Sequence, residues 1–174
     1  MLAMKLVRLI EAHSDALSQS LTSQIRNSDR TSDYRKISPK EVRLAASEVY
    51  RNLGEWLLQK TDDDIASRFR SIAAVRASEG IALHHFVWAL ILTRDHLWRF
   101  LYSEAFADSI VELHAELELQ QLLNQFFDRA IYYAIQGYAD AAQPARRKSP
   151  LARTEDLSTY IIDPLSFRRD IKRR

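Results

Sequence analysis

The scarcity of glycine and proline constrains this chain more than any other feature of its sequence. Its 174 residues include three glycines and four prolines, and three of the prolines fall in the last 31 residues (Pro144, Pro150 and Pro164). Pro39 follows Ser38 and precedes Glu41, the order of a helix N-cap, a first helical position and a capping-box partner. Since a sheet protein needs many more turn residues, residues 1–142 are predicted to form one all-α domain.

Apolar residues at steps of three and four predict a bundle of about five helices. The first two are expected over residues 4–26 and 38–60, with a polar, irregular segment between them. Thr61 and Asp64 have capping-box spacing and open a third helix, and Gly80 separates this helix from the next.

The last two predicted helices are longer. The fourth, over about residues 81–102, is apolar nearly all round in its first half, which is typical of a central helix surrounded by others. The fifth, over about residues 108–141, would be about 50 Å long at 1.5 Å per residue, more than a compact bundle accommodates. It is therefore expected either to kink near Gln120 and Gln121 or to pack partly on a second subunit.

Charge divides the chain near residue 142. Residues 143–174 hold nine Lys and Arg against four Asp and Glu, whereas residues 1–142 hold sixteen against nineteen. This basic tail contains an apolar island from Thr159 to Leu165, which suits docking in a groove of this chain or of a partner, and a mostly disordered tail is the alternative. Its basic clusters predict only salt-sensitive attraction to nucleic acid or anionic surfaces and no specific nucleic-acid binding.

Composition argues against most kinds of catalysis. The absence of cysteine excludes disulfides, zinc–thiolate sites and thiol nucleophiles, and three isolated glycines cannot form a phosphate-binding loop. No Gly-x-Ser-x-Gly sequence is present. The start lacks the pattern of a signal peptide, and the longest apolar run, residues 81–92, is too short to span a bilayer. We expect a soluble, cytoplasmic, non-enzymatic protein without a cofactor.

Five histidines are the first candidates for ligation. None forms a His-x-x-x-His or Glu-x-x-His pair, so no metal site is assigned. His13 occupies a core position of the first predicted helix, and a haem or metal site using His13 with His84 or His85 remains an alternative. The simpler interpretation of His13 is a partly buried imidazole bonded to one neighbour.

The fourth predicted helix carries the most unusual pattern, an arginine among apolar and aromatic residues. Trp88, Arg94 and Trp98 are candidates for a ligand site with aromatic walls, and His13 is a further candidate. The alternative is that Arg94 forms a structural ion pair. A second aromatic concentration, at residues 126–138, is more typical of a core or a dimer interface.

Residues in the third to fifth predicted helices carry a family resemblance. The block from Arg76 to Gly80, the pattern that follows it and the later aromatic positions together resemble the N-terminal domain of RsbRD-type RsbT co-antagonist proteins (Val87, Leu90, Leu92, Thr93, Arg94, Leu97, Trp98, Leu123, residues 127–130, Tyr138, and earlier Tyr50, Leu53 and Leu57). The resemblance covers about residues 1–140. It implies a helical sensory module, often dimeric, of the kind that precedes a STAS or histidine-kinase output domain.

The sequence departs from that arrangement after the helical domain. Only 32 residues follow residue 142, too few for such an output domain. We therefore expect a regulatory domain that acts through association with itself, as a homodimer, or with a separately encoded signalling protein, with the tail taking part. The resemblance marks Arg76, Gly80 and Arg94 as structurally or functionally important, without assigning them a ligand.

Overall fold

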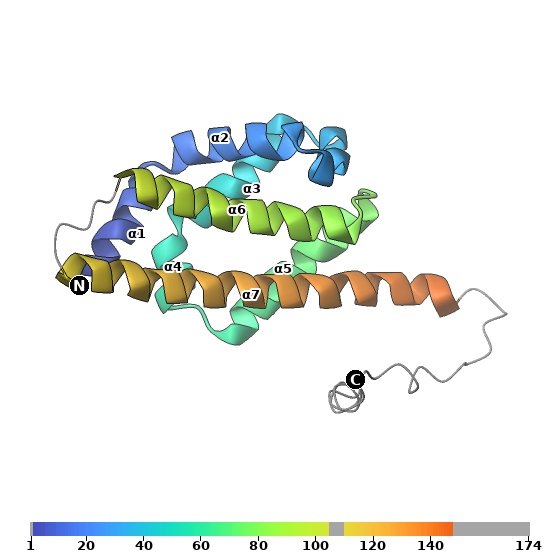
Figure 1. Cartoon of the computed structure of the whole chain (residues 1–174). Helices are drawn as coiled ribbons and strands as arrows, with labels where there is room; N and C mark the ends of the chain where they lie inside the picture. Colours follow the sequence, from blue (N-terminus) through green and yellow to red (C-terminus); the bar gives the residue numbers. More distant parts are fainter. Residues whose placement is uncertain (1, 105–109, 148–174) are drawn as a thin grey trace, which may run out of the picture.

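The computed structural model describes residues 2–104 and 110–147, which form helices and no strands. Seven are α-helices and one is a 3-10 helix: α1 (Leu2–Ala12), α2 (Ser14–Asn27), η1 (Asp29–Lys36), α3 (Pro39–Arg51), α4 (Leu53–Leu58), α5 (Asp62–Ser78), α6 (Leu83–Glu104) and α7 (Ile110–Arg147). Figure 1 shows α2, α6 and α7 side by side, with α3 and α5 behind them. The all-α prediction is confirmed, but five helices were too few.

Two of the predicted helices are each broken by one polar residue. His13 lies between α1 and α2, and its Nδ1 donates to the Leu9 carbonyl at 2.8 Å. Asn52 lies between α3 and α4, and its Nδ2 donates to the Glu48 carbonyl at 2.9 Å. Each side chain thus bonds the carbonyl four residues earlier, which competes with the backbone ladder and favours a bend. Neither break involves proline or glycine, so the apolar pattern did not reveal it.

Helix ends follow the sequence more closely. The Ser38 side chain accepts the Glu41 N–H with Pro39 in the first turn, and Thr61 with Asp64 forms a complete capping box. At the end of α5 Gly80 has φ of +72°, and the Ile81 N–H reaches back to the Arg76 carbonyl at 3.0 Å. This is a helix termination that needs the left-handed conformation of glycine.

The segment expected to be irregular is instead an ordered 3-10 helix. Thr31 and Tyr34 of η1 are buried, and the Thr31 hydroxyl donates to the Ile25 carbonyl. The Arg26 guanidinium donates to the carbonyls of Tyr34 and Ile37, at 3.2 and 2.7 Å. Side-chain to main-chain hydrogen bonds therefore hold this polar segment, and such bonds leave no periodic signal in a sequence.

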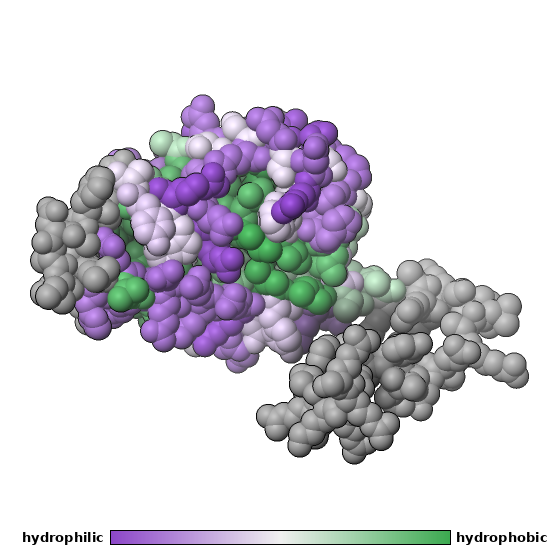
Figure 2. Space-filling model, in the orientation of Figure 1, coloured by the Kyte–Doolittle hydropathy of each residue, from purple (hydrophilic) through white to green (hydrophobic). Residues whose placement is uncertain are grey.

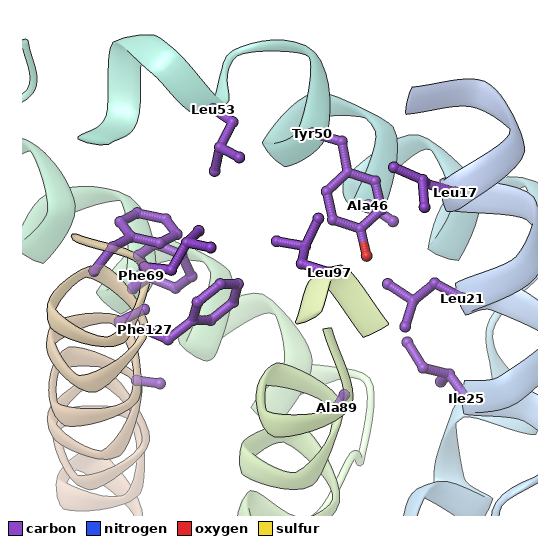
Figure 3. Close-up of a cluster of buried hydrophobic side chains, with 14 of the residues drawn as sticks. Leu17, Leu21, Ile25, Ala46, Tyr50, Leu53, Phe69, Ala89, Leu97 and Phe127 are labelled. Atoms are coloured by element: carbon purple, nitrogen blue, oxygen red, sulfur yellow. The ribbon is translucent and has the colours of Figure 1, made fainter. Parts of the chain in front are cut away.

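The core is built where α7 packs along α5 and where α2 packs on α3. The largest fully buried side chains include Tyr50 and Leu97, which lie close together in Figure 3, and Phe127 of α7, which lies beside Phe69 of α5. Each aromatic or aliphatic side chain buried in this way contributes roughly 1.5–3 kcal/mol.

The structure also corrects the prediction for the two long helices. α6 is central, but it is not surrounded: Figure 1 shows α2 and α7 along its sides and its near face open. α7 is one continuous helix of 38 residues, about 57 Å long, and no kink interrupts it at Gln120 and Gln121. It continues five residues beyond the expected boundary at residue 142. The remaining residues of the basic tail lie outside the described residues.

The contact between α5 and α7 depends on a missing side chain. A Cβ on Gly137 would lie 2.7 Å from the Arg70 carbonyl oxygen and 2.8 Å from the Ala73 Cβ. Both atoms belong to the backbone or to a short, rigid side chain of α5, so neither can move aside alone. Glycine at this position therefore sets how closely the two helices approach.

We predict that Gly137→Ala lowers the free energy of unfolding by about 1–3 kcal/mol, because the added methyl forces α5 and α7 apart. In an unobstructed helix the same change stabilises by about 1 kcal/mol, so the sign is diagnostic. Urea unfolding followed by circular dichroism measures the difference. Ala139→Gly, at an exposed position two residues away, is the control and should show the propensity cost alone. A stabilising Gly137→Ala would refute the close contact.

Candidate functional site

The residues singled out on α6 do not converge on one another. The Trp88 ring packs against the Arg30 guanidinium of η1 at 4.4 Å, and Trp98 packs against Tyr102 at 6.0 Å between ring centroids. Arg94 lies 3.5 Å from an Asp95 oxygen and 3.7 Å from an Asp128 oxygen of α7. These contacts match the ion-pair alternative for Arg94, and each of the three residues has a different partner.

The histidines expected to cooperate also lie apart. His13 is exposed rather than in the core, and its ring packs on Phe100 at 5.4 Å. His84 and His85 contact each other at the opposite end of α6, about 22 Å away along the helix at 1.5 Å per residue. Such a separation cannot bridge one metal or haem iron within a chain. Among the described residues no group of three or more His, Asp or Glu side chains is placed to hold a metal ion.

His85 has a different partner, Asp33 of η1. One Asp33 oxygen accepts from His85 Nδ1 at 2.7 Å and from the Ala82 N–H at 2.9 Å, while the other accepts from Lys36 Nζ at 2.7 Å. Lys36 first, then the Ala82 amide and the His85 ring, hold the pKa of Asp33 far below its ordinary value. Asp33 therefore ties η1 to the start of α6 as an ionised carboxylate.

A second feature is an apolar face shared by α6 and α7. Val87, Ile91, Arg94, Trp98 and Tyr102 recur at steps of three and four on α6, opposite its buried stripe. On α7 the facing residues are Leu117, Asp128, Ile131 and Ile135, with Gln121 and Asn124 at the helical steps between Leu117 and Asp128, and the Arg94–Asp128 pair joins the two helices. We call the nine residues other than Gln121 and Asn124 the α6–α7 face. Tyr102, Leu117 and Ile135 are 67%, 53% and 44% exposed. Figure 2 shows hydrophobic surface gathered between the two helices on this side.

A third feature is a cavity of about 90 Å³ in the middle of the bundle. Leu21 and Ile25 of α2 border it on one side, Ala89 of α6 and Phe127 of α7 on the others, as their positions in Figure 3 show. This space is partly open rather than enclosed, and an apolar ligand bound in it would cover apolar surface that is otherwise accessible to water.

The cavity adjoins a groove of about 200 Å³ between α3 and α5, two helices that make few contacts with each other. The two spaces share five lining residues: Ala45, Val49, Phe69, Ile72 and Arg76. The Arg76 side chain is only 10% exposed and donates to Glu79 Oε2 at 2.5 Å. Arg76 is therefore a buried, positively charged residue that lies between the apolar cavity and the solvent-accessible groove.

Comparison with known protein families shows which family the helical domain matches. Residues 15–149 match the family described as the RsbT co-antagonist protein rsbRD N-terminal domain, and the match covers most of the chain. The chain belongs to the RsbRD N-terminal domain family. No curated protein and no solved structure shows a match to it. No helix among the described residues is long and apolar enough to cross a membrane.

Most of the positions that carry the RsbRD resemblance lie on α5, α6 and α7 or at the turn between α5 and α6, and the earlier ones lie on α3 and α4 (Tyr50, Leu53 and Leu57). Arg76 and Gly80 form the end of α5, where Arg76 borders the cavity and Gly80 turns the chain toward α6. The Tyr138 hydroxyl of α7 donates to the Ile81 carbonyl at 3.0 Å just after that turn. The shared pattern therefore describes one connected substructure that forms a wall of the cavity.

Sequence reasoning missed Tyr34 of this RsbRD domain and gave no role to His96, although His96 lies within the unusual pattern of the fourth predicted helix. Tyr34 borders the cavity but comes from the segment predicted to be irregular, so no pattern marked it. His96 is buried, with its ring nitrogens 3.4 Å from the Tyr50 hydroxyl and 3.1 Å from the Ser20 hydroxyl, and burial lowers the pKa of His96. A signal did exist for the position of Arg76, which follows Ile72 and Ala73 at helical steps on the buried stripe of α5.

We predict that Asp33→Asn lowers the thermal midpoint by several degrees at pH 7, because it removes the charge that Lys36 and His85 contact. Since the pKa of Asp33 is depressed in the folded state, its contribution is complete above the ordinary aspartate pKa of about 3.9 and is lost as pH falls below it. The gap between wild type and Asp33→Asn should therefore shrink between about pH 5 and pH 2. Thermal unfolding across this range measures it, and a constant gap would contradict the assignment.

Proposed function

We propose that this RsbRD domain is a cytoplasmic, non-enzymatic regulatory module that acts through protein association and pairs with a second copy through the α6–α7 face. The family is a regulatory one, associated with RsbT co-antagonist signalling. The observation that carries the pairing is the group of uncovered apolar side chains on two core helices. Exposed apolar side chains occur singly on most monomers, whereas apolar side chains gathered on two neighbouring helices are typical of an interface.

The chemistry of the face suits self-association. Val87 and Ile91 of α6 lie at its aliphatic end with Ile131 and Ile135 of α7, and the Arg94–Asp128 pair lies in the middle. Trp98 and Tyr102 supply aromatic area at the other end. Arg94 and Asp128 give it one charge of each sign, so two copies related by a twofold axis would present complementary charges to each other. An isologous contact of this kind needs no partner of different chemistry.

A separately encoded signalling protein is the second partner that we propose. The support is the association of the family with RsbT co-antagonist regulatory signalling. The basic tail, with its apolar island at residues 159–165, is the proposed contact, and it lies outside the described residues. Deletion of residues 148–174 is the direct test: it should abolish co-purification of such a partner and leave self-association unchanged.

We predict that Ile135→Glu weakens self-association at least tenfold, since it places a charge in the aliphatic end of the face. Sedimentation equilibrium should give about twice the chain mass of 20.2 kDa for the wild type at micromolar concentration. Leu44→Glu is the matched control, because Leu44 is 60% exposed on α3, away from the face. Circular dichroism establishes that both variants are folded. A wild type that stays monomeric at 100 µM would overturn the proposal, as would equal effects of the two substitutions.

A further inference from the structure

We propose that the central cavity and its groove form a binding site for a short aliphatic carboxylic acid, with the chain in the cavity and the carboxylate on Arg76. The site is separate from the α6–α7 face, and binding at it does not require self-association. It also differs from the cluster of Trp88, Arg94 and Trp98, because Trp88 and Arg94 border neither the cavity nor the groove.

The interior selects for an aliphatic chain. The walls of the cavity come from α2, η1, α3, α5, α6 and α7, and most of their side chains are apolar, among them Leu21, Val42, Phe86 and Phe127. Away from Arg76 and Tyr34 the polar exception is Thr93, whose hydroxyl already donates to the Ala89 carbonyl at 2.8 Å. Because a cavity of about 150 Å³ accommodates a benzene ring, about 90 Å³ holds about four carbon atoms.

The polar end of the site selects for an acceptor with negative charge. Among the described residues, Glu79 is the one hydrogen-bond acceptor of the Arg76 guanidinium, which leaves other N–H donors of this side chain facing the groove. Tyr34 borders the same cavity and is only 5% exposed, and its hydroxyl has no hydrogen-bond partner among the described residues. Burial raises the pKa of Tyr34, so its hydroxyl keeps the proton and donates.

Two buried donors next to each other indicate an anionic ligand rather than a neutral or cationic one. The Arg76 guanidinium carbon lies 6.0 Å from the centre of the Tyr34 ring, so the two side chains border the same part of the cavity. Glu79 balances the charge of Arg76, so a bound anion would gain hydrogen bonds from the remaining N–H donors rather than net charge neutralisation, which disfavours a doubly charged phosphate. A monocarboxylate with a chain of four to six carbons fits both the apolar cavity and the polar end at Arg76.

The groove supplies the entrance. It is bordered by Glu48 and Arg68, which pair with each other, and by Ile72 and Val75 of α5. Ala45 of α3 borders both the groove and the cavity and is itself exposed, so it stands at the passage between them. A large side chain at this position would close the passage without entering the packed core.

Isothermal titration of the full chain with sodium hexanoate tests the site. We expect saturable binding by hexanoate, binding at least tenfold weaker by hexan-1-ol, which lacks the charge, and none by hexylammonium, which reverses it. Arg76→Gln should weaken hexanoate binding at least tenfold. The difference in affinity between hexanoate and hexan-1-ol should also be smaller for this variant than for the wild type. Equal binding of all three probes, or none by hexanoate up to 10 mM, would overturn the proposal.

Ala45→Trp provides a test that does not depend on the stability of the Arg76 variant. It should abolish hexanoate binding, while Ala74→Trp, at an exposed position of α5 that borders neither space, should leave binding unchanged. Unchanged binding in Ala45→Trp would place the ligand elsewhere and refute the site. Ile135→Glu should bind hexanoate as the wild type does, so a failure of the self-association proposal is separable from a failure of this one.

Discussion

The close approach of α5 and α7 at Gly137 is the constraint on which the rest of the bundle depends. With no Cβ at this position, the backbone of α7 reaches the backbone of α5 near Arg70 and Ala73. The contact positions Phe127 against Phe69 and brings Tyr138 to the turn after Gly80. Since α6 then packs on both helices, the geometry of one glycine determines where the central helix lies and how much space remains inside.

Much of this fold follows from local sequence rules, because the physics of helix ends is local. Ser38, Thr61 and Gly80 each specify a boundary through atoms within a few residues, and the structure has a boundary at each. The breaks at His13 and Asn52 depend on tertiary packing that turns the apolar stripe in a new direction, and a polar side chain then takes over a main-chain carbonyl. The position of each break depends on contacts between helices, so the residue pattern of one helix does not predict it.

The same distinction explains the outcome for the candidate site. Arg94 stands out in the sequence because its neighbours along the helix are apolar, yet its charge is balanced by Asp95 and by Asp128 on another helix. Arg76 looks like an ordinary residue at a helix end, but the packing of six elements encloses it beside a cavity. A residue that differs from its neighbours can be found in the sequence. A residue that borders a cavity can be found only once the helices are packed together.

The length of α7 has a consequence for whatever follows it in the chain. Tyr138 is the last residue described on this helix that packs against the core, and the helix continues to Arg147, about 14 Å further. Along this part of the helix each residue turns the direction by about 100°. A one-residue change in its length would reorient the following segment by more than a quarter turn, while a seven-residue change would nearly preserve its direction. The length of this part of α7 thus sets both the distance and the direction of the segment that follows it.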